Sequence, residues 1–283
     1  MKSILTRVSG PSPTETIVLP PAGAQVPGTF RNVTSNGAAY RSVLAQVQRF
    51  RGRVYLEDGA IMPAELTPDG RHMLPIDYRS WHVIAVEKSG VVRGCLRFLE
   101  ESGATRFEDL WLHTAAIAHC PAVGQKVRRA VESEMARARS EDVRFGEVGG
   151  WAIAEEHRCG WEALRLVLAT YGLLQLLGGC IGLATATVRH GSARILRKIG
   201  LTGLSGGDAP LAPYYEPQYG CQMEMLRFDS RRANERFMEW IEELASCLPT
   251  ASVIASAPST RMLSAWRGAQ ADHAPALVKT AVA

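Results

Sequence analysis

The order of apolar segments between residues 145 and 201 constrains the fold more than any other feature of this chain. Residues 145–154 predict a strand, the apolar run 161–177 predicts a long helix, and the short apolar run 180–188 predicts a buried strand. Another helix is predicted over residues 192–199 and ends at a glycine, as helices often do. Strand, helix and strand in this order predict a βαβ unit in the middle of a sheet.

Further periodic segments lie on both sides of this unit. Helices are predicted by apolar residues at three- and four-residue steps at 38–58, 120–139 and 234–247. Strands are predicted at 81–87, 91–99 and 221–228, and the first two form a hairpin. The chain is therefore expected to be an α/β (α+β) protein, in which a mixed, mostly antiparallel central sheet is flanked by helices.

The two ends of the chain have a different composition. Residues 1–37 are rich in Pro, Gly, Ser and Thr, which predicts an extended N-terminal arm. Residues 249–283 are small, polar and rich in alanine, which predicts a poorly packed C-terminal tail. One domain is expected between them, at residues 38–248.

Composition excludes several classes of protein. Apolar residues make up 46% and charged residues 21% of the chain, and the net charge is +4, which is too little for a nucleic-acid-binding arm. The six cysteines are scattered, so neither a disulfide framework nor a metal site is predicted, and a reducing, cytoplasmic location is expected. The longest apolar region, 164–183, contains polar residues and glycines, so no integral membrane segment is predicted.

Basic residues gather in two places. They are Lys126, Arg128, Arg129, Arg137 and Arg139 in the first cluster and Arg189, Arg194, Arg197 and Lys198 in the second. Such clusters are often solvated helix faces. The alternative interpretation is a docking surface for an acidic partner.

Two short segments carry a family pattern. Residues 193–201 are similar to Ala-x-x-Leu-Tyr-x-x-x-Gly-Phe, with Leu196 at the position that often holds a thiol-protonating tyrosine. The loop before residue 161 matches Arg/Gln-x-x-Gly-x-Gly/Ala at Gly160, and Glu162 stands where a small residue normally lets a pyrophosphate approach. These segments resemble the acyl-donor half of GNAT-type N-acyltransferases, which implies an acyl-donor core at residues 145–201.

Upstream segments match a narrower pattern. Arg51-Gly-Arg-Val-Tyr55 is similar to Arg-x-x-Val-Phe, and Asp77 to the last acid of Glu-x-Asp-x-x-Asp. Residues 92–99 are similar to Val-x-Gly-x-x-Arg-Leu-Leu, and residues 147–153 to Glu-x-Ser-Arg-Phe-x-Val. Over residues 40–201 the chain therefore resembles acyl-homoserine-lactone (autoinducer) synthases and long-chain N-acyl amino acid synthases, which are GNAT-fold enzymes.

The resemblance implies an acyltransferase. It would move a fatty acyl group from a thioester of acyl carrier protein (ACP) to the amine of an amino acid or a similar small molecule. The basic clusters would attract ACP, which is acidic. No permanently bound cofactor is expected, because acyl-ACP, or acyl-CoA, is a donor substrate. The alternatives are an acyl-homoserine-lactone synthase, a CoA-dependent GNAT acetyltransferase, and a non-catalytic module that binds an acyl ligand or a partner protein.

Within this reading Glu147 is the candidate general base, because a buried carboxylate beside the thioester has a raised pKa. The alternative role for Glu147 is an ion pair with Arg97 or Arg51. Backbone N–H groups of the strand that includes Val148, Gly149, Gly150 and Trp151 would stabilise the oxyanion.

Two further groups of residues are assigned to substrates. Arg51, Asp77 and Arg97 form an expected ionic cluster that shapes the acceptor pocket, together with Tyr55, and binds a substrate carboxylate. The donor phosphate is assigned to the helix N-terminus and its preceding loop, at His157, Arg158 and Gly160.

Overall fold

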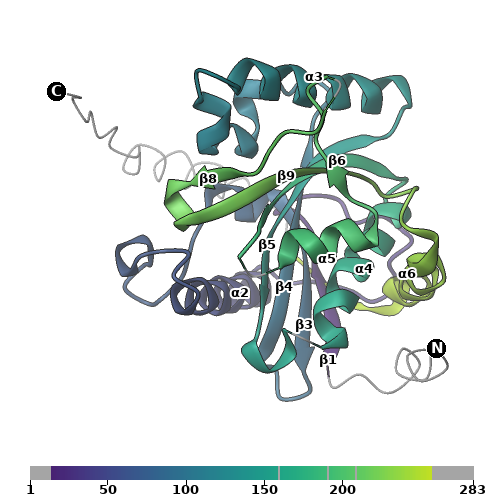
Figure 1. Ribbon diagram of the computed structural model, residues 1–283. Helices are drawn as coiled ribbons and strands as arrows, with labels where there is room; N and C mark the ends of the chain where they lie inside the picture. Colours follow the sequence, from purple (N-terminus) through teal and green to yellow (C-terminus); the bar gives the residue numbers. More distant parts are fainter. Residues whose placement is uncertain (1–13, 159, 190, 208, 257–283) are drawn as a thin grey trace.

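The middle of the sheet consists of strands that the sequence predicts. β3 (Ser80–Glu87) and β4 (Val92–Glu101) form the hairpin, and β5 (Arg144–Ile153) pairs antiparallel with β4 and parallel with β6 (Cys180–Thr187). β9 (Cys221–Asp229) is antiparallel to β6. The computed structural model describes residues 14–158, 160–189, 191–207 and 209–256 of the chain (Figure 1).

Both ends of the described chain join this sheet. β1 (Thr14–Leu19) pairs antiparallel with β3, and β10 (Ser252–Ala255) lies parallel between β1 and β2 (Val33–Ser35). The predicted boundaries at 37 and 249 are therefore wrong as limits of the folded unit. Val18 and Val253 are fully buried, so these short strands gain apolar contacts that local composition does not reveal. Residues 1–13 and 257–283 lie outside the described residues.

Two short strands extend the opposite edge of the sheet. β7 (Thr202–Gly203) and β8 (Tyr214–Glu216) both pair antiparallel with β9, between a predicted helix and a predicted strand. The complete ten-stranded sheet has the order β2-β10-β1-β3-β4-β5-β6-β9-β7, with β8 beside β9. It is mixed and mostly antiparallel, as expected.

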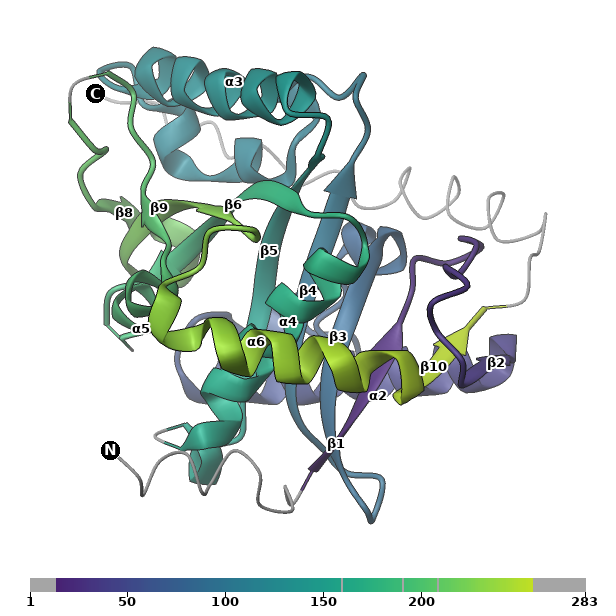
Figure 2. The ribbon, with the colours of Figure 1, turned by 90° about the vertical axis from the view of Figure 1, so that its right-hand side faces the viewer.

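Helices cover both faces of the sheet, as Figure 2 shows in a view turned by 90°. One face carries α2 (Gly37–Glu57) over β1, β3 and β4, and α3 (Gly124–Ser140) over β5, β6 and β9. The other face carries α4 (Trp161–Leu176), α5 (Ser192–Ile199) and α6 (Glu235–Cys247). α2 begins where Asn36 accepts hydrogen bonds from two backbone N–H groups, which caps the helix.

Short 3₁₀ helices occupy most of the connections. They are η1 (Pro63–Glu65), η2 (Pro75–Arg79), η3 (Phe107–Asp109), η4 (Trp111–Thr114), η5 (Ala116–His119), η6 (Glu155–His157), η7 (Pro217–Tyr219) and η8 (Leu248–Thr250). None of the helices in the described part of the chain has the length and apolar character needed to cross a bilayer.

Candidate active site

The parallel strands β5 and β6 separate partway along their length. Their last paired residues are Val148 and Ala184, although β5 continues to Ile153 and β6 to Thr187. Beyond this point β5 has no ladder partner on its β6 side, so its backbone groups are free to meet a ligand. β5 and β6 are therefore splayed apart at this end.

A β-bulge lies at the point of separation. One residue separates Cys95 and Arg97 on β4, whereas two separate their partners Ala152 and Gly149 on β5. Gly150 is one of the two β5 residues in the bulge and has φ of 63°, a left-handed conformation that glycine adopts without strain. The bulge bends β5 away from β6 and shifts the side chains that follow it to the other face.

A cavity of about 250 Å³ occupies the gap between the two strands. The face with α2 and α3 contributes a polar wall, which includes Tyr55, Arg97, Glu147, Tyr214, Glu216 and Tyr219. The face with α4 and α5 contributes an apolar wall, which includes Leu96, Val148, Ala163, Ala184, Ala186 and Leu196. The cavity therefore passes through the sheet, polar on one side and apolar on the other.

Glu147 lies in the polar wall with both carboxylate oxygens fixed. The backbone N–H of Trp111 donates to Oε1 and that of Leu112 to Oε2, each at 2.7 Å. Burial, and to a smaller extent the Glu101 carboxylate, raises the pKa of Glu147 to about 7. Among the described residues Glu147 forms no salt bridge, so the alternative ion-pair role is not supported. Its oxygens have further lone pairs, so it is suited to accept a proton near neutral pH.

Asp77 joins the two arginines of the predicted cluster. Arg51 binds it in a bidentate manner, with Nη1 3.0 Å from Oδ1 and Nη2 2.8 Å from Oδ2. Arg97 Nη1 lies 3.2 Å from the same Oδ1. Arg51 and Asp77 are almost fully buried and do not line the cavity, whereas Arg97 does. The structure therefore supports substrate contact only for Arg97.

The cluster keeps an excess positive charge beside the cavity. Two arginines share one aspartate, and burial lowers the pKa of His72 and of His82 to about 4, so both imidazoles are neutral at pH 7. In the described part of the chain the Arg97 guanidinium has no hydrogen-bond partner other than Asp77. The polar wall is therefore prepared for an anionic group of a ligand.

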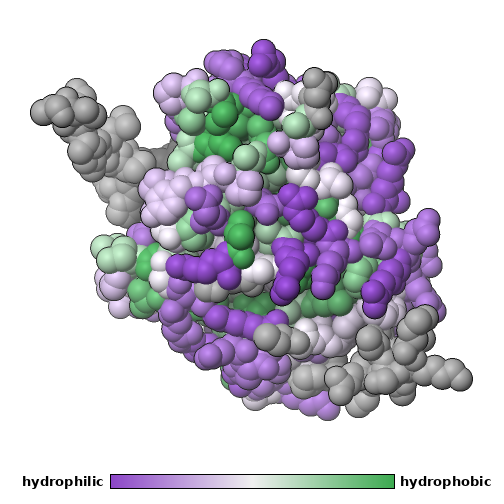
Figure 3. Space-filling model, in the orientation of Figure 1, coloured by the Kyte–Doolittle hydropathy of each residue, from purple (hydrophilic) through white to green (hydrophobic). Residues whose placement is uncertain are grey.

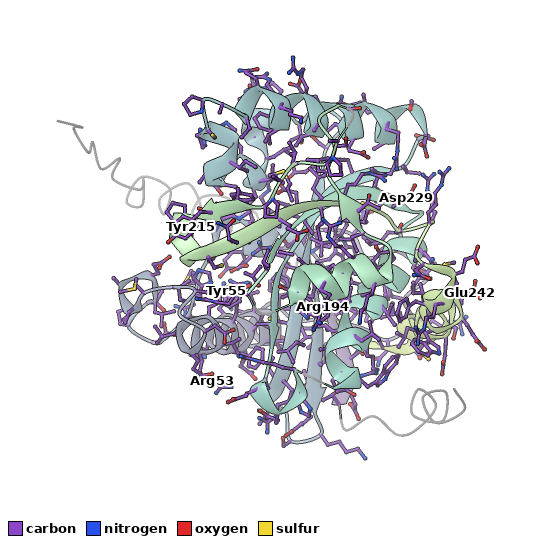
Figure 4. The ribbon with its side chains drawn as sticks, in the orientation of Figure 1. Arg53, Tyr55, Arg194, Tyr215, Asp229 and Glu242 are labelled. Carbon is purple, nitrogen blue, oxygen red and sulfur yellow. The ribbon has the colours of Figure 1, made fainter. Side chains whose placement is uncertain are left out.

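The other residues predicted along β5 border the gap. Val148, Gly149, Gly150 and Trp151 all line the cavity. The Tyr55 hydroxyl donates to the Trp151 carbonyl at 3.5 Å, and Figure 4 shows Tyr55 on the side of α2 that faces β8 and β9. The four predicted residues of β5 and Tyr55 are thus brought together at the cavity.

Only one of the three predicted phosphate residues lies at the cavity. Arg158 lines it and forms a 2.7 Å ion pair with Asp58, the residue that follows α2. His157 lies in η6 and Gly160 caps α4, and neither lines the cavity. Arg189, which the sequence assigns to a basic cluster, lines the cavity and donates to the Asp58 carbonyl at 2.7 Å. Arg158 and Arg189, which both bind Asp58, therefore form the cationic end of the cavity.

Glu162 does not lie where the family pattern places it. Its Oε2 accepts a 2.6 Å hydrogen bond from Thr14 Oγ1 and lies 3.5 Å from Arg165 Nη1. This carboxylate fastens α4 to β1 and is absent from the cavity lining. In this structure Glu162 therefore does not stand in the cavity where it would meet a donor pyrophosphate.

Three residues of the polar wall are not among those predicted from the sequence. Tyr214 and Glu216 lie on β8, and Tyr219 lies on η7, in a segment for which the sequence predicts neither a helix nor a strand. The available signal was the short run Tyr-Tyr-Glu in a segment otherwise rich in glycine and proline. Such a run is too short to predict a strand that depends on pairing with β9.

Each basic cluster is only partly ion-paired. On α3, Arg128 pairs with Glu108 and Glu132, and Arg137 pairs with acids that include Asp229, whereas the other three cations of this cluster form no ion pair within the described ranges. On α5, Arg197 pairs with Glu224, but Arg194 and Lys198 have no ion pair within the described ranges. Figure 3 shows the hydrophilic surface over α5, and Figure 4 shows Arg194 on this helix. Positive charge without an ion-pair partner is therefore found on both helices, and α5 borders the cavity.

The sheet order and the splayed strand pair define a GNAT-like fold. The structure is similar to that of BjaI, a CoA-dependent acyl-homoserine lactone synthase solved with S-adenosylmethionine (SAM) and isopentyl-CoA, with a TM-score of 0.52 and 16% identity over 90% of this chain and 99% of that chain. The N-acyl amino acid synthase FeeM from uncultured soil microbes gives a TM-score of 0.45 at 12% identity, over 77% of this chain and 93% of that one. The similarity to BjaI confirms, at the level of the fold, the resemblance indicated by the motifs.

Comparisons at the level of sequence add nothing to this similarity in fold. No family model matches the chain, and no curated protein matches it. Within the described ranges no group of three or more His, Cys, Asp and Glu residues is arranged to hold a metal ion.

Proposed function

We propose that this chain transfers an acyl group from a phosphopantetheine thioester to the α-amino group of an amino acid or a similar small molecule. The observation that carries the proposal is the amphipathic cavity between β5 and β6. An acyl chain fits its apolar wall, and a polar acceptor fits the wall that holds Arg97 and Glu147. A thioester placed between β5 and β6 would contact both the apolar wall and the polar wall of the cavity.

The acceptor carboxylate binds Arg97, whose charge Asp77 compensates only in part because Asp77 also pairs with Arg51. Glu147 takes a proton from the amine, and the amine nitrogen bonds to the thioester carbonyl carbon. Backbone N–H groups of residues 148–151 stabilise the oxyanion that forms. The carbon–sulfur bond then breaks, and the products are an amide and a thiol.

The leaving thiolate needs a proton. Leu196, at the position of the family's thiol-protonating tyrosine, lines the cavity and carries no hydroxyl. Glu147 holds the proton that the amine released, and it returns this proton to the sulfur. One group thus serves as base and then as acid, for which a pKa near 7 is suitable.

ACP is the proposed donor carrier. The unpaired Arg194 and Lys198 on α5 support this choice, because an acidic carrier protein would be attracted to the helix that borders the cavity. A CoA donor is the second candidate. It is favoured by Glu162, which points to β1 and leaves the donor end without that negative charge.

The test is a thiol-release assay on the purified chain with acyl-ACP or acyl-CoA and a mixture of amino acids. We expect thiol release that depends on the acceptor, with an N-acyl amino acid identified by mass spectrometry. A higher kcat/KM with acyl-ACP supports the carrier-protein donor, and a higher value with acyl-CoA supports the alternative. Absence of turnover with every donor and acceptor would contradict the proposal and favour a non-catalytic binding module.

A further inference from the structure

The proposed reaction releases a proton that must leave the cavity. An α-amino group has a pKa of about 8, so the acceptor is mainly an ammonium ion near pH 7. Its nitrogen loses two protons when the amide forms: one is transferred to the sulfur of the thiol, and the other is released. Glu147 is the base for both protons, but the acceptor and the thioester would cover it on the cavity side. A path for the released proton through the protein is therefore expected.

Glu101, the last residue of β4, lies on the same face of the sheet as Glu147. In the antiparallel β4–β5 ladder Leu99 pairs with Glu147, and Glu101 pairs with Phe145. Directly paired residues share a face, and diagonal neighbours lie about 7–8 Å apart, which two long side chains can span. The two carboxylates are therefore neighbours, although Glu101 does not line the cavity.

Glu101 is buried and only partly satisfied by the protein. Its side chain is 1% exposed, and its Oε2 lies 3.6 Å from Nη2 of Arg79, whose side chain is 49% exposed. Oε2 also accepts a 3.2 Å hydrogen bond from Thr105 Oγ1. Oε1 is buried and has no hydrogen-bond partner among the described residues. Buried polar atoms are rarely left in this state, so Oε1 is suited to take up a proton from a neighbouring group.

Charged groups on several elements surround the two carboxylates. Burial and the charge of Glu101 raise the pKa of Glu147, and Arg97, on the other side of Glu147 along β4, lowers it. Burial also raises the pKa of Glu101, whereas Arg79 lowers it. Other groups nearby are Asp109 on η3, which raises the pKa of Glu101, Arg139 on α3, which donates to the Gly103 and Thr105 carbonyls, and Tyr214 and Glu216 on β8, which line the polar wall. Each carboxylate thus lies between one arginine and the other carboxylate.

We propose that Glu101 relays a proton from Glu147 to solvent, and that its negative charge keeps Glu147 basic. Glu147 takes the first proton from the ammonium nitrogen and passes it to Glu101, directly or through one water. Glu101 releases it at the surface beside Arg79. Glu147 is then ionised again, takes the second proton as the nitrogen bonds to the carbonyl carbon, and returns it to the sulfur. Glu101 is a positioning residue that acts through Glu147, and its role rests on the proposed function.

The first test requires no turnover. Carboxyl carbons of the full chain labelled with ¹³C-glutamate are titrated by NMR in the parent chain, in Glu101→Gln and in Glu147→Gln. We expect the titration of Glu147 to move from about 7 toward the ordinary value of 4.5 in Glu101→Gln. The titration of Glu101 should also move to lower pH in Glu147→Gln, because each carboxylate loses a neighbouring negative charge.

The matched control is Glu100→Gln. Glu100 precedes Glu101 and its side chain points to the opposite face of β4, where it is 38% exposed and pairs with Arg144. We expect both titrations to stay in place in this variant. Thermal melting shows whether each variant remains folded, and Glu101→Asp, which keeps the charge, serves as the conservative variant.

The second test uses turnover. Glu101→Gln should move the inflection of kcat/KM to lower pH and lower kcat by roughly tenfold, which is less than the 10²–10⁴-fold expected for loss of the base itself. The KM for the acceptor should not change, because Glu101 does not line the cavity. Glu101→Asp should recover most of kcat, because it retains a carboxylate that can carry the proton.

The two tests separate this inference from the proposed function. Titrations that stay in place in both glutamine variants, or an inflection and a kcat that Glu101→Gln leaves unchanged, overturn the inference even if acyl transfer occurs. Equal shifts in Glu100→Gln and Glu101→Gln overturn it as well. Reciprocal titration shifts without any thiol release support the coupling of the two carboxylates and contradict the proposed function.

Discussion

At the scale of single residues, Glu147 connects the chemistry of the cavity to pH. Its carboxylate is held by two backbone N–H groups and has a pKa of about 7 because it is buried. Only the ionised form accepts a proton, so we expect kcat/KM to rise with pH through about 7. The pH–rate profile measures this. Glu147→Gln should lower kcat/KM by roughly 10²–10⁴-fold, as expected for loss of a general base, and a profile that keeps its inflection in this variant would exclude Glu147.

A rise in pH through about 7 is expected to increase activity, but it reduces the stability that Glu147 contributes. The folded pKa of Glu147, about 7, lies above the ordinary value of 4.5, so the folded chain binds this proton more tightly than the unfolded chain. The stabilisation is complete below the unfolded pKa and is lost as pH rises through the folded pKa, and it is on the order of 3 kcal/mol. Urea unfolding across this range should therefore show a pH dependence that is smaller in Glu147→Gln. An identical pH dependence in both proteins would argue against this assignment.

Asp77 is the residue on which the buried cluster depends. It accepts hydrogen bonds from Arg51, Arg97 and the Gln48 amide. Asp77→Asn leaves two arginine charges buried without a counter-charge, and we expect a loss of about 3–5 kcal/mol in the free energy of unfolding. Urea unfolding measures the change.

The control for this change is Asp69→Asn. Asp69 is exposed and pairs with Arg49 and Arg71, and exposed pairs typically contribute less than about 1 kcal/mol. Similar losses in the two variants would show that burial does not decide the energetics of the Asp77 cluster.

At the scale of elements, the bulge in β5 opens the cavity. Gly150 has φ of 63°, and a Cβ there would lie 3.4 Å from the Cβ of Arg97. Gly150→Ala should cost about 1–2 kcal/mol of stability, because a side chain is strained in this conformation, and it should also lower kcat by displacing the backbone donors and Arg97. Gly90→Ala is the control, since Gly90 has φ of 86° in the β3–β4 turn and open space around it. A loss of stability without a loss of activity in Gly150→Ala would remove the bulge from the proposed mechanism.

At the scale of the whole molecule, β10 links two segments that are distant in the sequence. It lies between β1 and β2, and Val253 is fully buried. A chain that ends after Leu248 loses this strand and leaves β1 as an unpaired edge, whereas a chain that ends after Ser256 keeps it. We expect a markedly lower Tm for the first truncation than for the second, measured by circular dichroism. Equal Tm values would restore the interpretation of residues 249–256 as a dispensable tail.

Much of the fold was predictable because its signals are local. The apolar periodicity of 38–58 and 192–199 corresponds to α2 and α5, and the hairpin and the βαβ unit follow from alternation, turns and segment length. Arg97 and Glu147 were likewise found through short motifs. β1, β8 and β10 were missed, because strands of a few residues are stable only when a distant partner pairs with them.

The sequence by itself therefore determined the class of fold, the order of its central elements and the identity of Arg97 and Glu147 as candidates. Only the tertiary structure decided that Glu162 fastens α4 to β1, that Arg51 is engaged by Asp77 and His72, and that Glu216 enters the cavity from β8. The physical reason is that the role of a charged side chain depends on which partners reach it, and these partners come from segments that only strand pairing across the sheet brings together.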